Sequence, residues 1–255
     1  MNLSDMSWRQ AGGAFEEGTI ALIPVGSIEN HGPHLPLGTD YFTALHIAER
    51  VSREGEWILV PPIPVGVSEH HRQFPGSLFV EPEVLRAYCL GICRSLSTHG
   101  IRKIVYVNGH GGNTAALNET IMTLRKENIH AFVFQWWDAV ADLISEICEL
   151  PHDHAGDMET SMILCLRPEL VHEERFREAA ADVSEWGRVI HGVQTAFDTV
   201  DFTPSGVVGN PEYATAAKGK RLYDASAGEL FLFCEWLDKQ GEETLSSQGA
   251  VGTKE

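Results

Sequence analysis

Residue types that bind metal ions are concentrated in one short segment, Ile23 to Asp40 (IPVGSIENHGPHLPLGTD). The segment is rich in glycine and proline and contains Glu29, His31 and Asp40. Divalent metal ions bind carboxylate oxygens and imidazole nitrogens held at fixed distances. We therefore interpret these three residues as candidate metal ligands. The alternative is that Glu29 and His31 are solvated loop residues and that Asp40 caps the helix that follows.

A second cluster, Asn108 to Asn113, reads NGHGGN and lies between an expected strand and an expected helix. Glycines let the backbone approach a ligand closely and leave N–H groups free at the start of the helix. His110 is the candidate ligand of this cluster. The alternative is a glycine-rich phosphate cradle with an incidental histidine, although no Lys-Ser/Thr pair follows as in a Walker A motif.

A third cluster, His152 to Ser161, reads HDHAGDMETS. His154 is the candidate for proton transfer, and Glu159 is the candidate for a further carboxylate at the metal site. Asp157 begins a helix, where carboxylates are favoured by the helix dipole, so a capping role and a functional role both remain open.

A fourth cluster consists of Glu69, His70, His71 and Arg72. It is consistent with a pocket wall, a contact with a partner subunit or a solvated loop. Arg72 is a candidate for holding an anionic group of the substrate. For His34, in the first cluster, we expect a structural role.

Short apolar runs alternate with amphipathic stretches along the chain. The runs predict strands at 19–25, 57–65, 102–107 and 131–136, the second of them broken by Pro61 and Pro62. The amphipathic stretches predict helices at 41–51, 82–97, 114–126, before 148, at 158–165 and at 214–239. This alternation predicts an α/β fold, a mostly parallel sheet between two layers of helices. Sites in such sheets lie beyond the carboxyl ends of the strands, where the loops after 25 and 107 begin. We expect one domain over residues 1–255, with 240–255 as a disordered tail.

The composition and net charge indicate a globular protein and argue against a nucleic-acid-binding one. The chain has 255 residues, 43% hydrophobic and 22% charged, which is ordinary for a globular protein. Its net charge of −17 argues against a nucleic-acid partner, which needs a surplus of lysine and arginine. No apolar run is long enough to cross a membrane, and no secretory leader is visible. Five cysteines without a CxxC motif indicate a reducing compartment, so we expect a cytoplasmic protein.

Together, four motifs resemble those of the creatininase (creatinine amidohydrolase) family. They are GSIENHGPHLPLGTD, the EH…FPG loop at 69–76, NGHGGN and HAGDMETS. The resemblance covers roughly Ile20 to Lys218 and implies an α/β/α sandwich, two divalent ions (zinc, manganese or iron) and a homohexamer. It implies that Glu29 and His110 bind one ion, that His31 binds the other, and that Asp40 bridges the two.

The chain departs from creatininase itself at Gly112, where that enzyme has an acidic residue two positions after the histidine of NGH. The departure argues against creatinine as the substrate and makes Glu159 the expected replacement ligand. The sequence is more similar to members with NGHGGN. These include formamide deformylases of flavin and deazaflavin biosynthesis and a peptidase that trims a redox-cofactor precursor.

We therefore predict a metal-dependent amidohydrolase that cleaves a C–N bond of a small amide, formamide or cyclic amide. Two ions would generate a hydroxide for attack on the carbonyl, and His154, with Glu159 beside it, would transfer protons. The alternatives are a creatininase-like peptidase acting in cofactor maturation and a non-catalytic metal-binding scaffold. A phosphoesterase would be expected to have more basic residues near the site.

Overall fold

A parallel four-stranded sheet forms the centre of the computed structural model, which describes residues 1–15, 19–150, 153–180, 189–241 and 244–245. The strand order is β2-β1-β3-β4. The strands are β1 (Ile20–Val25), β2 (Ile58–Leu59), β3 (Lys103–Asn108) and β4 (His130–Gln135). Because every pair is parallel, all four carboxyl ends lie at the same edge of the sheet.

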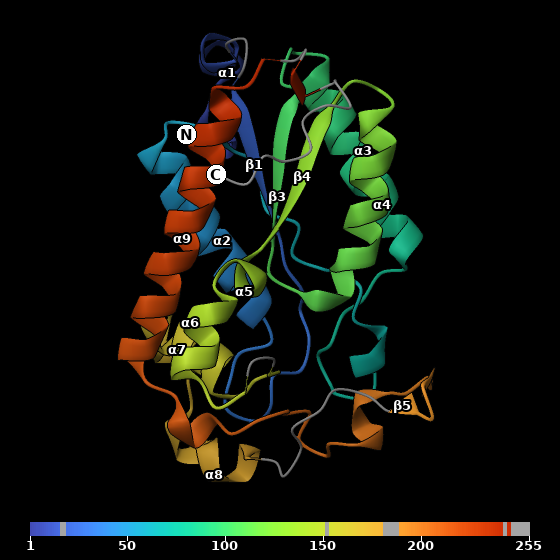
Figure 1. The fold of residues 1–255 in the computed structure, drawn as a ribbon, viewed down its shortest axis with the longest axis vertical. Coiled ribbons are helices and arrows are strands. Elements are labelled where there is room, and N and C mark those ends of the chain that lie inside the picture. Colours follow the sequence, from blue (N-terminus) through green and yellow to red (C-terminus); the bar gives the residue numbers. More distant parts are fainter. Residues whose placement is uncertain (16–18, 151–152, 181–188, 242–243, 246–255) are drawn as a thin grey trace.

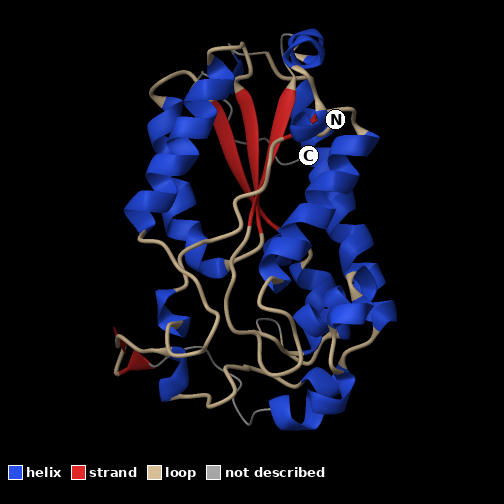
Figure 2. Ribbon diagram, turned by 180° about the vertical axis from the view of Figure 1, so that it is seen from behind, coloured by secondary structure: helices blue, strands red, loops and turns tan. Residues whose placement is uncertain are grey.

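Helices cover both faces of the sheet, as Figures 1 and 2 show. One layer contains α2 (Thr39–Glu54) and α9 (Ala216–Asp238), and the other contains α3 (Pro82–Ser97) and α4 (Thr114–Arg125). The predicted three-layer α/β/α fold is therefore confirmed. The shorter elements are α1 (Trp8–Ala14), α5 (Trp136–Ala139), α6 (Ala141–Ile147), α7 (Asp157–Leu166), α8 (Phe176–Ala179) and a hairpin of β5 (Val189–Ile190) and β6 (Val193–Gln194).

Alternating side chains of β1 fill two separate hydrophobic cores. Ile20 and Leu22 are buried in the core shared with α2 and α9, whereas Ala21 and Ile23 are buried in the core shared with α3 and α4. A strand covered on both faces reads as a continuous apolar run, because neither set of alternating side chains faces water. This explains why the run at 19–25 predicts its strand correctly.

Two expected elements differ from the structure. The strand expected at 57–65 is reduced to β2, because Pro61 and Pro62 have no N–H to donate to the sheet, and the chain rejoins β1 only at Ile63. The helix expected before Cys148 is divided into α5 and α6 at Val140. Most of the expected tail, 242–243 and 246–255, lies outside the described residues. Within the described residues, no helix combines the length and apolarity needed to cross a bilayer.

The register of the sheet brings three connections to one place. Val25 pairs with Asn108, and Asn108 pairs with Gln135, so β1, β3 and β4 end side by side. The loop after β1, the NGHGGN turn after β3 and helix α5 after β4 all leave this edge and enter the lower half of the view in Figure 1. The fold thus gathers the suspected loops at the edge where the sequence predicts a site.

Candidate metal centre

The candidate ligands meet at this edge in three overlapping groups. Glu29, Asp40 and His110 form the first group, and His31, Asp40 and Glu159 form the second. The third group consists of Glu29, His31 and His154. Within each group, one potential ligand atom from each residue lies within 4.8 Å of the others. All are buried except Glu159, which is partly exposed. Asp40 belongs to the first two groups, Glu29 to the first and third, and His31 to the second and third.

The two oxygens of Asp40 face two different histidines. Oδ1 lies 3.1 Å from Nε2 of His31, and Oδ2 lies 3.1 Å from Nδ1 of His110. Asp40 stands in the first turn of α2, where the helix dipole favours a negative charge. The N-cap residue of the helix is Gly38, and no side chain forms a capping hydrogen bond. The carboxylate of Asp40 therefore does not cap the helix and instead faces the two histidines.

Backbone carbonyls fix the orientation of three histidine rings. In each, one ring nitrogen lies within hydrogen-bonding distance of a carbonyl oxygen, so in the neutral ring the other nitrogen carries the lone pair. The pairs are His31 Nδ1 with Glu29 O (3.1 Å), His110 Nε2 with Val67 O (3.0 Å) and His154 Nε2 with Asn30 O (2.8 Å). Each remaining nitrogen faces a carboxylate. A lone pair and a carboxylate repel each other unless a proton or a cation lies between them, so the donor set fits metal ions.

The pKa shifts of the cluster also indicate that positive charge stabilises it. Burial lowers the pKa of His31, but the carboxylates of Asp40, Glu159 and Glu29 outweigh it and raise the pKa to about 10. Burial raises the pKa of Glu29, but the neighbouring His110 dominates and lowers the pKa to about 2. The carboxylates of Glu29 and Asp40 are therefore ionised and draw positive charge into the site, either as protons on the histidines or as metal ions.

Glu159 enters the site through a strained turn. Its Oε2 accepts a hydrogen bond of 2.7 Å from the backbone N–H of Ala155 and lies 3.6 Å from Nε2 of His31. Ala155 has φ of +55°, an unfavourable value for a residue other than glycine. Burial raises the pKa of Glu159 to about 7. The turn therefore places the Glu159 carboxylate in the site, and the N–H of Ala155 holds it there.

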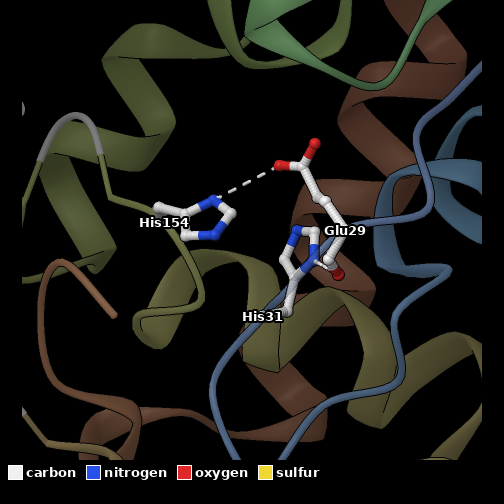
Figure 3. A group of neighbouring side chains, drawn as sticks. All are labelled: Glu29, His31 and His154. Carbon is white, nitrogen blue, oxygen red and sulfur yellow. Dashed lines mark hydrogen bonds and ion pairs between the residues drawn. The ribbon is translucent and has the colours of Figure 1, made fainter. Parts of the chain in front are cut away.

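His154 belongs to the third ligand group, with Glu29 and His31, and faces Glu29, as Figure 3 shows. Its Nδ1 is 4.0 Å from Oε1 of Glu29 and 3.9 Å from Oε2 of Glu159. Burial, with a further contribution from the charge of His31, lowers the pKa of His154 to about 3. The ring is therefore neutral near pH 7 and can accept a proton at Nδ1.

These residues open into a cavity of about 420 Å³. Four of the five candidate ligands, Glu29, Asp40, His110 and Glu159, belong to its lining. The wall beside them is formed by Trp137, Asp153, Met158 and Val208. Of the two tryptophans after β4, Trp136 is buried in the core and Trp137 lines the cavity. No lysine or arginine is among the described residues that line the cavity. The volume is suited to a small substrate or a short peptide end.

Four residues with open roles now have defined positions. Asp157 is buried and forms an ion pair of 2.8 Å with the partly exposed Lys218, which is consistent with a structural role. Arg72 is bound to Asp198 and does not line the cavity. His70 and His71 line the cavity, so this cluster forms part of the pocket wall. His71 is the residue whose proximity to the ligands we did not predict, and its only signal is the EH…FPG motif itself.

Gly112 is held where a larger side chain does not fit. A Cβ atom at this position would lie 2.2 Å from the carbonyl oxygen of Val67 and 2.5 Å from Nε2 of His110. The hydrogen bond between those two atoms occupies the space that an acidic side chain would enter. Position 112 therefore accommodates an acidic side chain only if the carbonyl of Val67 moves.

We expect Gly112→Ala to lower the free energy of unfolding by about 1–3 kcal/mol, because a backbone carbonyl must move to admit the methyl group. Urea unfolding of the metal-free protein measures the change. Gly111→Ala is the matched control, since no atom lies within 4 Å of a Cβ built there. Equal stabilities of the two variants would contradict the crowding argument.

His34 is buried outside the cavity, as predicted for a structural residue, and its Nε2 lies 2.9 Å from Oγ1 of Thr160. Burial, helped by the charge of His31, lowers its pKa to about 3.

Between about pH 6.5 and pH 3 the unfolded chain binds a proton at His34 that the folded chain does not, so stability falls as the pH falls. We expect this one group to contribute a slope of about 1.4 kcal/mol per pH unit in that window. Urea unfolding at several pH values should give a smaller slope for His34→Gln, and an unchanged slope would contradict the assignment.

Comparison with known proteins gives a consistent result. Residues 4–234 match the family model Creatininase, described as creatinine amidohydrolase. The chain is 35% identical over 217 residues to a mycofactocin precursor peptide peptidase of Mycobacterium tuberculosis, covering 80% of each chain. It is 26% identical over 250 residues to a creatinine amidohydrolase of Pseudomonas putida, covering 90% of this chain and 91% of that protein.

Solved structures with a similar fold also include a creatinine amidohydrolase. A crystal structure of creatinine amidohydrolase superimposes with a TM-score of 0.79 at 21% identity, covering 94% of this chain and 98% of the other. The relatives are named as enzymes that hydrolyse C–N bonds, in agreement with the predicted hydrolase. The family match spans all four motifs, and the structure brings ligand-type residues from three of them together at one site. The chain belongs to the creatininase family.

Proposed function

We propose that the protein is a dinuclear metal-dependent amidohydrolase that cleaves a C–N bond of a small amide, formamide or cyclic amide. The observation that carries the proposal is Asp40, whose two oxygens each lie 3.1 Å from a nitrogen of a different histidine, His31 and His110. A carboxylate shared in this way is suited to hold two ions at a fixed separation. Glu29 and His110 would hold one ion, and His31 and Glu159 the other.

When bound, a pair of divalent ions supplies Lewis acidity, which favours deprotonated water near neutral pH and polarises a carbonyl oxygen. Solved creatininases described as "Creatininase Mn" and as Zn-Zn type make manganese and zinc the first ions to test, followed by iron. We propose a homohexamer in the cytoplasm, as the family resemblance and the cysteine usage suggest.

The protein residues would move the protons. His154 is neutral at pH 7, and the bond from its Nε2 to the carbonyl of Asn30 places the lone pair on Nδ1, where it would accept a proton from the attacking water. Nδ1 then donates that proton to the leaving nitrogen, which departs as a neutral amine. Glu159, 3.9 Å from Nδ1, favours the protonated imidazole between the two steps. Trp137 would pack against the substrate on the far wall of the cavity.

A peptidase is the second candidate, because the chain shares 35% identity over 80% of its length with a peptidase of a cofactor precursor. Both candidates use the same attack on an amide carbonyl. They differ in the group that the cavity accepts beyond the scissile bond.

The test is a screen of metal-free protein and of protein reconstituted with manganese, zinc or iron. Substrates are small amides, formamidopyrimidines, cyclic amides including creatinine, and short peptides, with amine release as the readout. We expect turnover only after reconstitution. Hydrolysis of peptides alone would favour the second candidate. Full metal loading without any hydrolysis would contradict the proposal and favour a metal-binding scaffold.

A further inference from the structure

The short turn η2 (Glu69–His71) presses two histidines against the metal centre. His71 is completely buried, and its Nε2 lies 3.5 Å from Oε1 of Glu29. The ring of His71 is also 4.7 Å from the ring of His154, centroid to centroid. The ring of His70 lies parallel to that of His110, at 6.1 Å and an angle of 10°. The turn therefore contacts residues from both ends of the site.

Glu29 has two oxygens with different surroundings. Oε2 lies 3.2 Å from Nε2 of His110, on the side of the ligand group formed with Asp40. Oε1 faces away from that group, between His71 at 3.5 Å and Nδ1 of His154 at 4.0 Å. Because the Nε2–H of His154 is directed to the carbonyl of Asn30, His154 in its neutral form has no proton to offer to Oε1. The ring of His71 is placed to supply that donor.

The amino side of the turn is fixed to the sheet. Oγ of Ser27, just after β1, donates to Oγ of Ser68, which donates in turn to the carbonyl of Leu78. The backbone N–H of Val67 donates to the side-chain oxygen of Asn113 at 2.9 Å. These bonds fix the position from which the turn begins.

The carboxyl side is fixed by an arginine clamp. The guanidinium of Arg72 donates to both carboxylate oxygens of Asp198, at 2.6 and 2.5 Å, and Gln73 donates to the same carboxylate. A bidentate pair fixes orientation as well as distance. Arg72 directly follows His71, so the clamp restrains the turn next to the residue that faces Glu29.

We propose that His71 is a positioning residue of the metal centre, which orients Glu29 through Oε1, and that the Arg72–Asp198 clamp holds His71 in place. The inference rests on the proposed function, because Glu29 must be a metal ligand for its orientation to matter. His71 belongs to none of the groups of ligand atoms that the described residues form. Its role is therefore that of a partner to a ligand. Loss of such a partner lowers metal affinity or activity by roughly 10- to 100-fold.

The test measures the affinity of the full-length protein for Mn²⁺ and Zn²⁺ by competition with a chelator. We expect binding about 10- to 100-fold weaker in His71→Ala, with partial recovery in His71→Gln, whose amide can donate to the same oxygen. Thermal unfolding of the metal-free variants reports separately on general destabilisation. Unchanged affinity in His71→Ala would overturn the positioning role. If that variant does not fold, affinity in His71→Gln and Arg72→Ala decides.

Arg72→Ala tests the clamp at an exposed position. We expect weaker metal binding than in the wild type, by a smaller factor than in His71→Ala. Arg94→Ala is the matched control, because Arg94 forms a similar bidentate pair with Glu127 at the opposite edge of the sheet. Equal affinity in Arg72→Ala and Arg94→Ala would overturn the clamp. A wild-type protein that binds no metal would instead refute the proposed function, so the two failures are distinguishable.

Discussion

Replacing His154 with alanine is expected to lower kcat by about 100- to 10,000-fold while leaving the bound metal in place. The loss is large because Nδ1 of His154 is the neutral nitrogen that faces the site between Glu29 and Glu159. Without it, the leaving nitrogen must depart without a proton. Metal binding should persist because five other residues supply the two groups that are proposed to bind the ions.

The measurement compares kcat and metal content of His154→Ala and the wild type on the substrate that the screen identifies. The pH profile is informative as well, since loss of the proton carrier should remove a titration that the wild-type profile contains. Loss of metal together with activity would instead place His154 among the ligands, as its distance to Glu29 and His31 allows. Retained activity would exclude it as the proton carrier.

Replacing Asp40 with alanine is expected to remove both metal ions and all measurable hydrolysis. Asp40 is the one residue shared by the two ligand groups that are proposed to bind the ions. Its removal takes a ligand from each ion and leaves His31 and His110 without the carboxylate between them. The effect on metal content should therefore exceed that of any single substitution confined to one group.

Metal analysis after gel filtration measures this result. Asp157→Asn is the matched control, because Asp157 is an equally buried carboxylate near the start of a helix that pairs with Lys218. The control should retain its metal even if its stability falls. Full occupancy in Asp40→Ala would contradict the bridging role.

The edge of the sheet at which the site forms could be predicted from the sequence. The run at 19–25 is apolar throughout because β1 is covered on both faces, and the segment that follows it carries Glu29 and His31. Parallel strands end at one edge, so the same rule brings the NGHGGN turn to that segment. Asp40 could be predicted as well, because it follows the same loop in the first turn of the helix.

The remainder of the site depends on contacts between distant segments. His71 lies against Glu29 because Val67, Ser68 and Arg72 bond to separate parts of the chain, and no local pattern encodes those bonds. The sequence makes Arg72 a candidate for binding a substrate, because its actual partner, Asp198, lies 126 residues further along the chain. The short β2 is the exception, because its local signal is the pair of consecutive prolines, Pro61 and Pro62, which cannot donate to a sheet.

Metal stoichiometry of the wild-type protein is the most direct test of the dinuclear centre. Apo protein is titrated with Mn²⁺ or Zn²⁺, separated from free metal and analysed by mass spectrometry of the elements alongside amino-acid analysis. Two ions per chain are predicted, with neither retained when Asp40 is replaced. A plateau at one ion per chain, or no retained metal at neutral pH, would contradict a centre bridged by Asp40.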